Sequence, residues 1–347
     1  MSLEAGLQRL WYGPRWWSLP LWPLGWLFRF AVALRLVLYR AGLLRARRVT
    51  VPVVVVGNIT VGGTGKTPVA AWLARQLGLR GYRVGVVLRG YGGRGGSRPR
   101  VVAPDSDPTE VGDEAVLHSL SRPHVVVVGA DRVAAARLAV DAGAEIIVCD
   151  DGLQHLRLAR EYEIAVVDAA RGVGNGLLMP AGPLREPPGR LEHVHAVVFA
   201  QRGQSASPNI ALRRPFTVVA RLRLGDAVNL LSGERRTLDR FQAHAVHAVA
   251  GVGHPQAFCD GLRAAGLRVE AHALPDHAAL DPAALPFPAG ATVLMTAKDA
   301  VKCRSFAGSD WWFVELEVGL ERSTARDLLA SIIERTGLCT GAGVHLG

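Results

Sequence analysis

Cysteine is scarce in this sequence. The four cysteines lie far apart and form no CxxC or Cys/His spacing, so the sequence predicts neither a zinc site nor a disulfide framework. A reducing, cytoplasmic setting fits this usage best. The four residues are Cys149, Cys259, Cys303 and Cys339.

Lysine is almost absent, being found only at Lys66, Lys298 and Lys302, so the net charge of +10 comes largely from arginine. Such an excess suits nucleic acid, anionic lipid or phosphorylated substrates, because each offers fixed negative charge to a guanidinium group. The composition argues against a disordered chain. The 347 residues are 49% hydrophobic and 20% charged, which is enough for a substantial core and for two domains.

The first 48 residues form a separate segment that carries five of the eight tryptophans. Residues 19–38 would span about 30 Å as a helix, roughly one hydrocarbon core. Arg29 and Arg35 interrupt this run, and a central arginine costs about 2.5–3.5 kcal/mol on insertion scales. We therefore favour an interfacial helix over a transmembrane helix, with a buried core helix as a third alternative.

Arginines follow this apolar run, where a cleavable signal peptide would have a small-residue cleavage site. They would face anionic lipid and keep the rest of the chain cytoplasmic. The cluster consists of Arg40, Arg45, Arg47 and Arg48.

From residue 49 to 210 the pattern predicts a doubly wound, mainly parallel α/β domain. Short runs of valine and isoleucine without polar alternation indicate strands buried on both faces, and helical stretches such as 69–79 and 132–142 separate them. Residues 211–347 look like a second, smaller α/β lobe with a β-ribbon, strands at 291–300 and 311–318, and a closing helix at 322–335. The strands expected in the first domain are 51–56, 84–88, 125–128, 146–149, 164–167 and 197–199.

A glycine-rich loop follows the first of these strands. The sequence GNITVGGTGKTP at 57–68 matches the last three positions of the P-loop motif G-x-x-x-x-G-K-[ST], although Thr60 replaces the first glycine. A glycine turn before a helix is the alternative. The motif predicts ATP phosphates on the backbone amides, a lysine on the β/γ oxygens and a hydroxyl on Mg²⁺. The expected nucleotide-binding residues are Thr60, Val61, Gly62, Gly63, Thr64, Gly65, Lys66 and Thr67.

Two acids end a neighbouring strand and are candidate Mg²⁺ ligands. Asp150 closes the apolar run at 146–149 and Asp151 follows it. An Asp pair in this place is more often a turn, but next to a GKT loop it favours a metal site. Asp113 begins another helical stretch, where it would ordinarily be an N-cap.

Eight sequence blocks in order resemble the tetraacyldisaccharide 4'-kinase family of lipid A biosynthesis. They begin at residues 57 (GNITVGGTGKTP), 88 (LRGYGGR), 111 (VGDE), 129 (GADR), 149 (CDDGLQH), 178 (LMPAGPLREP), 275 (PDH) and 296 (TAKDAVKC). Ala115 departs from the family, which has proline after GDE.

The resemblance implies ATP-dependent phosphorylation of the 4'-hydroxyl of an acylated glucosamine disaccharide 1-phosphate, on the cytoplasmic face of the bacterial inner membrane. It implies that Asp113 and His277 act as a proton-abstracting pair, and that Lys66 and Asp151 belong to the catalytic group. Mg²⁺ would be held by Thr67, Asp150, Asp151 and Glu186. The expected substrate-binding residues are Asn58, Arg89, Arg132, His155 and Arg185.

Two other functions share some of these features. A P-loop ATPase of the metal-insertion or partitioning type would act on a protein partner, but it needs no tryptophan-rich segment and usually has lysine where Val61 stands. A nucleic-acid-dependent ATPase would explain the charge, yet its aromatics would be interleaved with basic residues in the catalytic domain. The aromatics cluster at the N-terminus, so no nucleic acid partner is expected.

Overall fold

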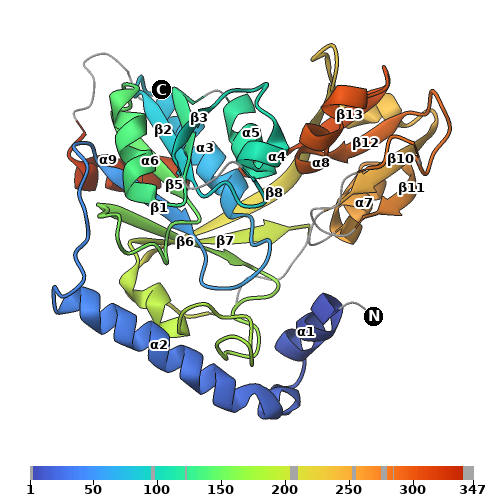
Figure 1. Cartoon of the computed structure of the whole chain (residues 1–347). Coiled ribbons are helices and arrows are strands. Elements are labelled where there is room, and N and C mark those ends of the chain that lie inside the picture. Colours follow the sequence, from blue (N-terminus) through green and yellow to red (C-terminus); the bar gives the residue numbers. More distant parts are fainter. Residues whose placement is uncertain are drawn as a thin grey trace.

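The protein was analysed as a computed structural model that describes residues 3–94, 98–121, 123–203, 210–251, 255–274, 280–283 and 285–338. One mixed sheet of 13 strands runs through both lobes (Figure 1), in the order β11-β10-β12-β13-β8-β7-β6-β1-β5-β2-β4-β3 with β9 paired to β8. From β8 to β4 neighbouring strands are parallel, and β3 is antiparallel to β4.

The strands of the first lobe are buried on both faces, as their composition predicts. Residues Val54 and Val56 of β1 face a core built with α3, α5 and α9, whereas Val53 and Val55 face a second core that includes α6. The strands are β1 (Val53–Gly57), β2 (Val84–Leu88), β3 (Arg100–Val102), β4 (Val125–Val128), β5 (Ile146–Asp150), β6 (Tyr162–Asp168) and β7 (Ala196–Arg202). The helices are α3 (Lys66–Gly78), α4 (Pro108–Val111), α5 (Asp113–Leu120) and α6 (Arg132–Asp141), with a 3₁₀ turn at Pro188–His193.

The second lobe extends the same sheet. The 14-residue strand β8 (Phe216–Asn229) pairs with β7 over its first half and antiparallel with β13 over its second, so one continuous strand joins the lobes. The other strands are β9 (Arg235–Arg236), β10 (Ala245–Ala250), β11 (Arg268–Ala273), β12 (Val293–Thr296) and β13 (Trp311–Gly319). Two helices cover its faces, α7 (Pro255–Ala264) and α8 (Ala297–Cys303), and 3₁₀ turns lie at Leu238–Phe241 and Arg304–Phe306.

Two features of the second lobe differ from the sequence expectation. The strand expected at 291–300 ends at Thr296, whose side chain caps α8 by accepting a hydrogen bond from the Asp299 amide at 3.3 Å. The closing helix α9 (Arg322–Thr336) leaves the second lobe and packs on the first, because Leu328, Leu329 and Ile332 join the core of that lobe. The division of the chain near residue 211 stays a prediction.

The N-terminal segment lies along one edge of the molecule (Figure 1). It consists of α1 (Leu3–Tyr12), a 3₁₀ turn (Arg15–Leu21) and α2 (Trp22–Arg40). Only 6% of the most apolar window in residues 15–40 is buried, so the alternative of a buried core helix is wrong. This stretch is the one candidate membrane span among the described residues. Within the arginine cluster, Arg48 pairs with Glu161 of the core at 2.8 Å.

Candidate active site

The glycine-rich loop connects β1 to α3 at the carboxyl edge of the parallel sheet, the usual position of ligands in such folds. Its first part is anchored: Thr60 forms a β-bridge to Leu184, and the Val61 amide donates to Pro183 O at 2.8 Å. Asn58 is fully buried at the base of the loop, where its Nδ2 donates to Gly62 O at 3.4 Å. The loop backbone is therefore held in place from residue 58 to residue 62.

Gly65 sets the entry to α3. It has φ +89°, a conformation that costs glycine nothing, and a Cβ at this position would lie 2.8 Å from Leu222 Cδ1 of β8. Both the positive φ and the close approach of Leu222 therefore disfavour any side chain at position 65. Lys66 and Thr67 consequently begin α3 with their backbone at the helix N-terminus, which favours phosphate.

Lys66 is enclosed by acidic groups. Its Nζ lies 4.0 Å from Asp151 Oδ2, and its side chain is 13% exposed. Burial acts to lower the pKa of Lys66, but the charges of Asp151, Glu114 and Asp150 outweigh it and raise the pKa. The ammonium group therefore stays protonated at neutral pH, as a phosphate-binding lysine must.

Asp150 closes β5 and is buried, being 1% exposed. Its Oδ2 lies 2.9 Å from Nε2 of His118, a buried residue on α5. Burial alone would raise the pKa of Asp150, yet His118, Lys66 and Thr67 together hold it below the usual range. Among the described residues, Asp150 Oδ1 and Thr64 Oγ1 are buried oxygens without a hydrogen-bond partner. A buried carboxylate oxygen of this kind suits a cation.

Asp151 follows with φ +51°, the only positive φ recorded for a non-glycine residue in the described chain. This left-handed conformation turns its side chain toward Arg185, whose Nη1 donates to Oδ1 at 3.0 Å and to Oδ2 at 3.3 Å. Asp151 is also the more exposed of the two acids, at 33%. The two predicted acids thus lie together, but one is buried and the other faces solvent.

Glu186 is buried in a network of its own. Its Oε1 accepts from Gln154 Nε2 at 2.7 Å and its Oε2 accepts from Arg190 at 3.2 Å. Gln154 also donates to Asn58 O at 3.0 Å, which connects Glu186 to the base of the loop. Both oxygens of Glu186 already accept hydrogen bonds, and its metal role stays a prediction.

The predicted substrate-binding residues near the β4 and β5 ends differ in environment. Arg132 begins α6 and is 4% exposed, with Nη1 donating to Gly129 O at 2.8 Å, whereas Arg89 is exposed at the end of β2. Burial, Arg132 and Arg160 lower the pKa of His155 to about 4, so its ring is neutral at pH 7. His155 Nε2 is buried and has no hydrogen-bond partner within the described part of the chain.

Asp113 is the first residue of α5. The sequence pattern would ordinarily place Asp113 at the N-cap, but Gly112 occupies that position. Asp113 Oδ2 lies 3.2 Å from Nζ of Lys302 on α8 of the second lobe, and the two side chains are 14% and 10% exposed. The pair links the lobes across the site. His277, its expected partner, lies outside the described residues.

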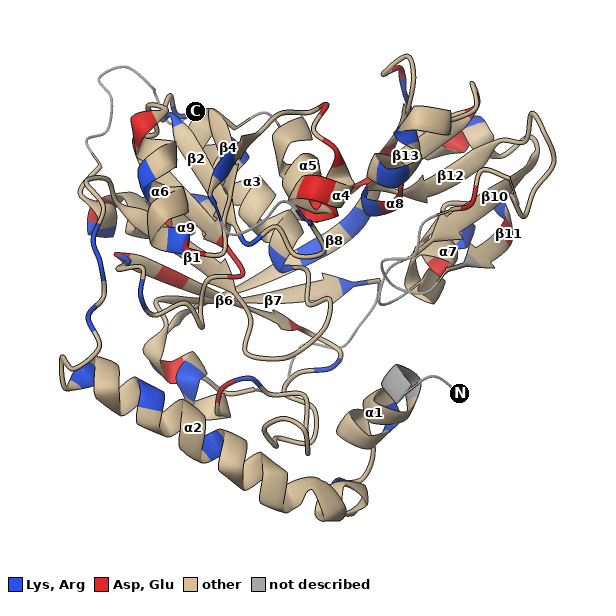
Figure 2. Ribbon diagram, viewed as in Figure 1, with Lys and Arg blue, Asp and Glu red and all other residues tan. Residues whose placement is uncertain are grey.

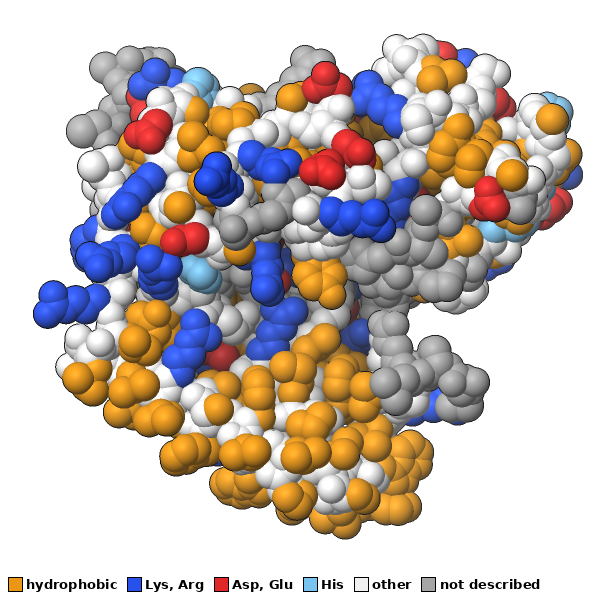
Figure 3. Space-filling model, in the orientation of Figure 1, with side chains coloured by type: hydrophobic (Ala, Val, Ile, Leu, Met, Phe, Trp, Pro, Cys, Tyr) orange, Lys and Arg blue, Asp and Glu red, His pale blue; other side chains and the backbone are white. Residues whose placement is uncertain are grey.

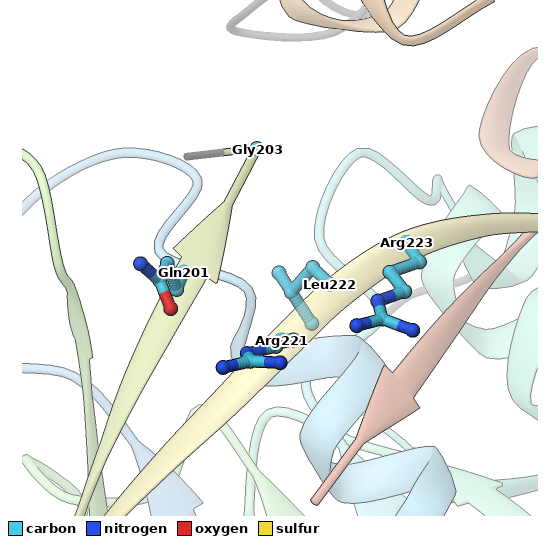
Figure 4. A pocket seen from close by; sticks show the side chains of 5 residues that line it. All are labelled: Gln201, Gly203, Arg221, Leu222 and Arg223. Carbon is cyan, nitrogen blue, oxygen red and sulfur yellow. The ribbon is translucent and has the colours of Figure 1, made fainter. Parts of the chain in front are cut away.

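A cavity of about 320 Å³ opens beside the loop (Figure 4), between the end of β7 and the middle of β8. The Leu222 side chain that lines it also lies against Gly65. Arg202, next to the cavity, is ion-paired with Asp168 at 2.8 Å and donates to Gly63 O at 3.3 Å. The lining residues are Gln201, Gly203, Arg221, Leu222 and Arg223.

Several residues of the site were missed from the sequence. His118 looked like any helical histidine, and its only signal is a polar side chain in a stretch whose neighbours Ala115, Val116 and Ser119 are buried. Lys302 lies about 190 residues from Asp113, and no local pattern connects them. Gln154 lies within the CDDGLQH block but was not singled out.

Three comparisons with known proteins agree. The sequence model of the family described as "Tetraacyldisaccharide-1-P 4'-kinase" matches residues 17–334. The "Tetraacyldisaccharide 4'-kinase" of Methylobacillus flagellatus is 44% identical over 333 residues, covering 95% of this chain and 97% of that protein. The protein of the same name from Alkalilimnicola ehrlichii is 46% identical, covering 92% and 94%.

A solved structure is also similar to most of this chain. The crystal structure of LpxK from Aquifex aeolicus in complex with ATP superposes with a TM-score of 0.79 at 28% identity, covering 92% of this chain and 99% of that chain. The expected P-loop kinase fold is thereby confirmed, and the comparison supports ATP binding.

Proposed function

This chain belongs to the tetraacyldisaccharide-1-phosphate 4'-kinase family, and from that premise we propose how its residues carry out the reaction. It transfers the γ-phosphate of ATP to the 4'-hydroxyl of a tetraacylated glucosamine disaccharide 1-phosphate, giving lipid IVA. The observation that carries this function is the family match over residues 17–334. The same match decides against a metal-insertion or partitioning ATPase.

Mg²⁺ would be held by Asp150 Oδ1 together with the Thr67 hydroxyl, and Asp151 would contact it from the solvent side. The buried Asp150 oxygen without a partner supports this assignment. Mg²⁺ supplies neutralisation of charge on the β- and γ-phosphate oxygens. Lys66 binds the same oxygens, and His118 orients Asp150 from behind at 2.9 Å. Glu186 would position Gln154 and the loop base through its hydrogen bonds.

Asp113 accepts the proton of the attacking 4'-hydroxyl. Phosphoryl transfer requires mainly positioning and charge neutralisation, plus one group that orients or deprotonates the nucleophile. Lys302, 3.2 Å away, fixes the carboxylate of Asp113 from the second lobe. His277 is assigned to the same pair only by resemblance to the family.

The nucleoside of ATP would enter the cavity beside the loop. Its volume of about 320 Å³ is at the lower end of the range for small-molecule sites, and it adjoins the loop through Leu222 and Gly65. Guanidinium planes stack well on aromatic rings, so Arg221 and Arg223 suit a purine.

The membrane surface would be contacted by the outer face of α2. Trp26, Leu27 and Phe30 are each 65% exposed, whereas Phe28 packs on the core and Gly25 approaches Ala181. Figure 3 shows hydrophobic side chains along this edge, with Lys and Arg in a band directly above it, and Figure 2 shows arginines along α2. A helix attached lengthwise to its domain favours interfacial binding over spanning. The basic band would face anionic lipid on the cytoplasmic side.

The acylated sugar would approach through a cavity of about 550 Å³ between α2 and the 3₁₀ turn after Pro187. Leu36, Leu156 and Pro187 give it apolar walls, Arg40 supplies positive charge, and Arg190 is ion-paired with Glu163 and Glu186. This combination suits a phosphorylated lipid. Arg132, His155 and Arg185 would contact the sugar and its phosphate, with the neutral His155 ring available to a hydroxyl.

The direct test is transfer of labelled phosphate from ATP to the disaccharide 1-phosphate in mixed micelles. The expected result is a lipid-extractable labelled product that requires the acceptor. Asp113→Ala should lower turnover far more than ATP affinity, whereas Lys66→Ala should impair ATP use directly. Hydrolysis of ATP that is independent of the acceptor, or stimulated by DNA, would contradict the kinase assignment.

A further inference from the structure

Three potential metal ligands converge on the outer edge of the second lobe, away from the candidate active site in the strand order. His247 lies on β10, and Glu270 and His272 lie on the edge strand β11. His247 is paired in register with Glu270, and the side chains of Glu270 and His272 project to the same face because they are two residues apart. The sheet itself therefore brings the three side chains together.

Two of the three distances between the ligand atoms lie near tetrahedral spacing. His247 Nδ1 is 3.0 Å from His272 Nε2 and 3.4 Å from Glu270 Oε2, and all three ligand atoms lie within 4.8 Å of one another. Zn–N and Zn–O bonds of 2.0–2.2 Å place neighbouring ligands of a tetrahedral ion about 3.3 Å apart. Shifts of a few tenths of an ångström would bring these first two distances to the tetrahedral value.

The side chains of His247, Glu270 and His272 are of the types that bind metal ions. Imidazole nitrogens and a carboxylate oxygen are groups that bind zinc in proteins. Arg268, on the same strand and face, has its guanidinium bonded to Ala243 O. Phe287 packs on both imidazole rings, with centroids 5.6 and 5.8 Å away, and limits their movement.

We propose that His247 Nδ1, His272 Nε2 and Glu270 Oε2 form a zinc site on the second lobe, with a fourth position open to water. Two imidazoles and one carboxylate suit Zn²⁺, whereas the oxygen-rich group around Asp150 suits Mg²⁺. The ion would clamp β11 to β10. Since His277 follows five residues after His272, the clamp would anchor the strand that precedes the segment carrying this residue.

A hydrogen bond between two neutral imidazoles is the competing explanation of the 3.0 Å contact. In that case His247 Nδ1–H or His272 Nε2–H donates to the other nitrogen, and the cluster needs no ion. The two explanations differ in what zinc does to the folded protein. A metal site gains stability when zinc is added, whereas a simple hydrogen-bonded pair does not.

The test is zinc binding to the full chain in competition with a chromogenic chelator, with Mg-ATP present to occupy the active site. We expect one equivalent of Zn²⁺ to bind, and binding to weaken at least about 10-fold in His247→Ala and in His272→Ala. The matched control is His124→Ala, because that histidine is bonded to a backbone carbonyl on the first lobe. Zinc should raise the melting temperature of wild type but not of His247→Ala.

Equal zinc affinity in wild type, His247→Ala and His272→Ala would overturn the proposal, as would a melting temperature that does not respond to zinc. If His247→Ala does not fold, zinc affinity can be compared between wild type and Glu270→Gln instead, because the Glu270 side chain is exposed and its replacement should not disturb folding. Bound Co²⁺ gives an independent measurement, because a tetrahedral site absorbs visible light strongly and Glu270→Gln should alter that spectrum. None of these measurements depends on kinase activity.

Discussion

At the scale of single residues, the contact between His118 and Asp150 is the most consequential one that the sequence did not reveal. Both side chains are buried, and the bond of 2.9 Å to Oδ2 leaves Oδ1 of Asp150 as a buried oxygen without a hydrogen-bond partner among the described residues. Groups that orient a metal ligand typically contribute 10–100-fold to metal affinity or activity. We therefore propose His118 as a positioning residue for Asp150.

Replacing His118 tests this role. His118→Ala should raise the Mg²⁺ concentration needed for half-maximal activity by about 10-fold or more, because Asp150 loses the contact that orients it. The measurement is a Mg²⁺ titration of phosphate transfer at saturating ATP. His118→Asn should recover part of the effect, and a Mg²⁺ requirement unchanged from wild type would contradict the role.

The protonation of His155 gives a second prediction. Its folded pKa of about 4 lies below the usual 6.5, so the unfolded chain takes up a proton first as pH falls. The free energy of unfolding should therefore decrease as pH drops from 6.5 toward 4, and this slope should be smaller in His155→Gln. Denaturant unfolding at several pH values measures it. Histidine NMR gives the direct check, since a His155 signal that titrates near pH 6.5 would refute the neutral ring.

At the scale of elements, α2 makes the sharpest prediction. Its outer face exposes Trp26 and Phe30, each 65% exposed, and burying such a side chain yields about 1.5–3 kcal/mol. The double variant Trp26→Ser/Phe30→Ser should lose more than about 10-fold in binding to anionic vesicles, measured by flotation. Leu79→Ser is the matched control, because Leu79 is 67% exposed but lies at the end of α3.

Elements whose sequence pattern lies within their own residues were predictable from the sequence. The strands at 84–88 and 125–128 coincide with β2 and β4, since apolar β-branched runs indicate strands buried on both faces. The position of α9 was not predictable: the amphipathic pattern shows that Ile332 must be buried but not on which lobe. The pairs His118–Asp150 and Lys302–Asp113 were not predictable either, because each joins parts of the chain that are distant in sequence.

At the scale of the whole molecule, the lobes share strand β8, the C-terminal helix α9 packs back on the first lobe, and α8 contributes Val301 to the core of that lobe. β8 belongs to both lobes, Lys302 pairs with Asp113, and Arg304 donates to Pro104 O at 3.4 Å. We propose that closure of the lobes would twist the shared strand and change these contacts.

Lys302→Met separates the two roles of that contact. It removes the charge near Asp113 but keeps a long apolar side chain, so turnover should fall by about 10-fold or more while ATP affinity stays unchanged. Steady-state kinetics with varied ATP measures both. Arg304→Met removes the hydrogen bond to Pro104 O without touching Asp113. Equal losses in the two variants would show that only lobe association matters.

The rarity of lysine has a practical consequence for this molecule. Two of its three lysines, Lys66 and Lys302, lie at the loop and beside Asp113, with side chains 13% and 10% exposed. Arginine carries almost all other positive charge and is inert toward reagents that acylate amines. Apart from the chain terminus and Lys298, amine-directed labels would mark only Lys66 and Lys302, and occupancy by nucleotide could be followed as protection of the peptide that carries Lys66.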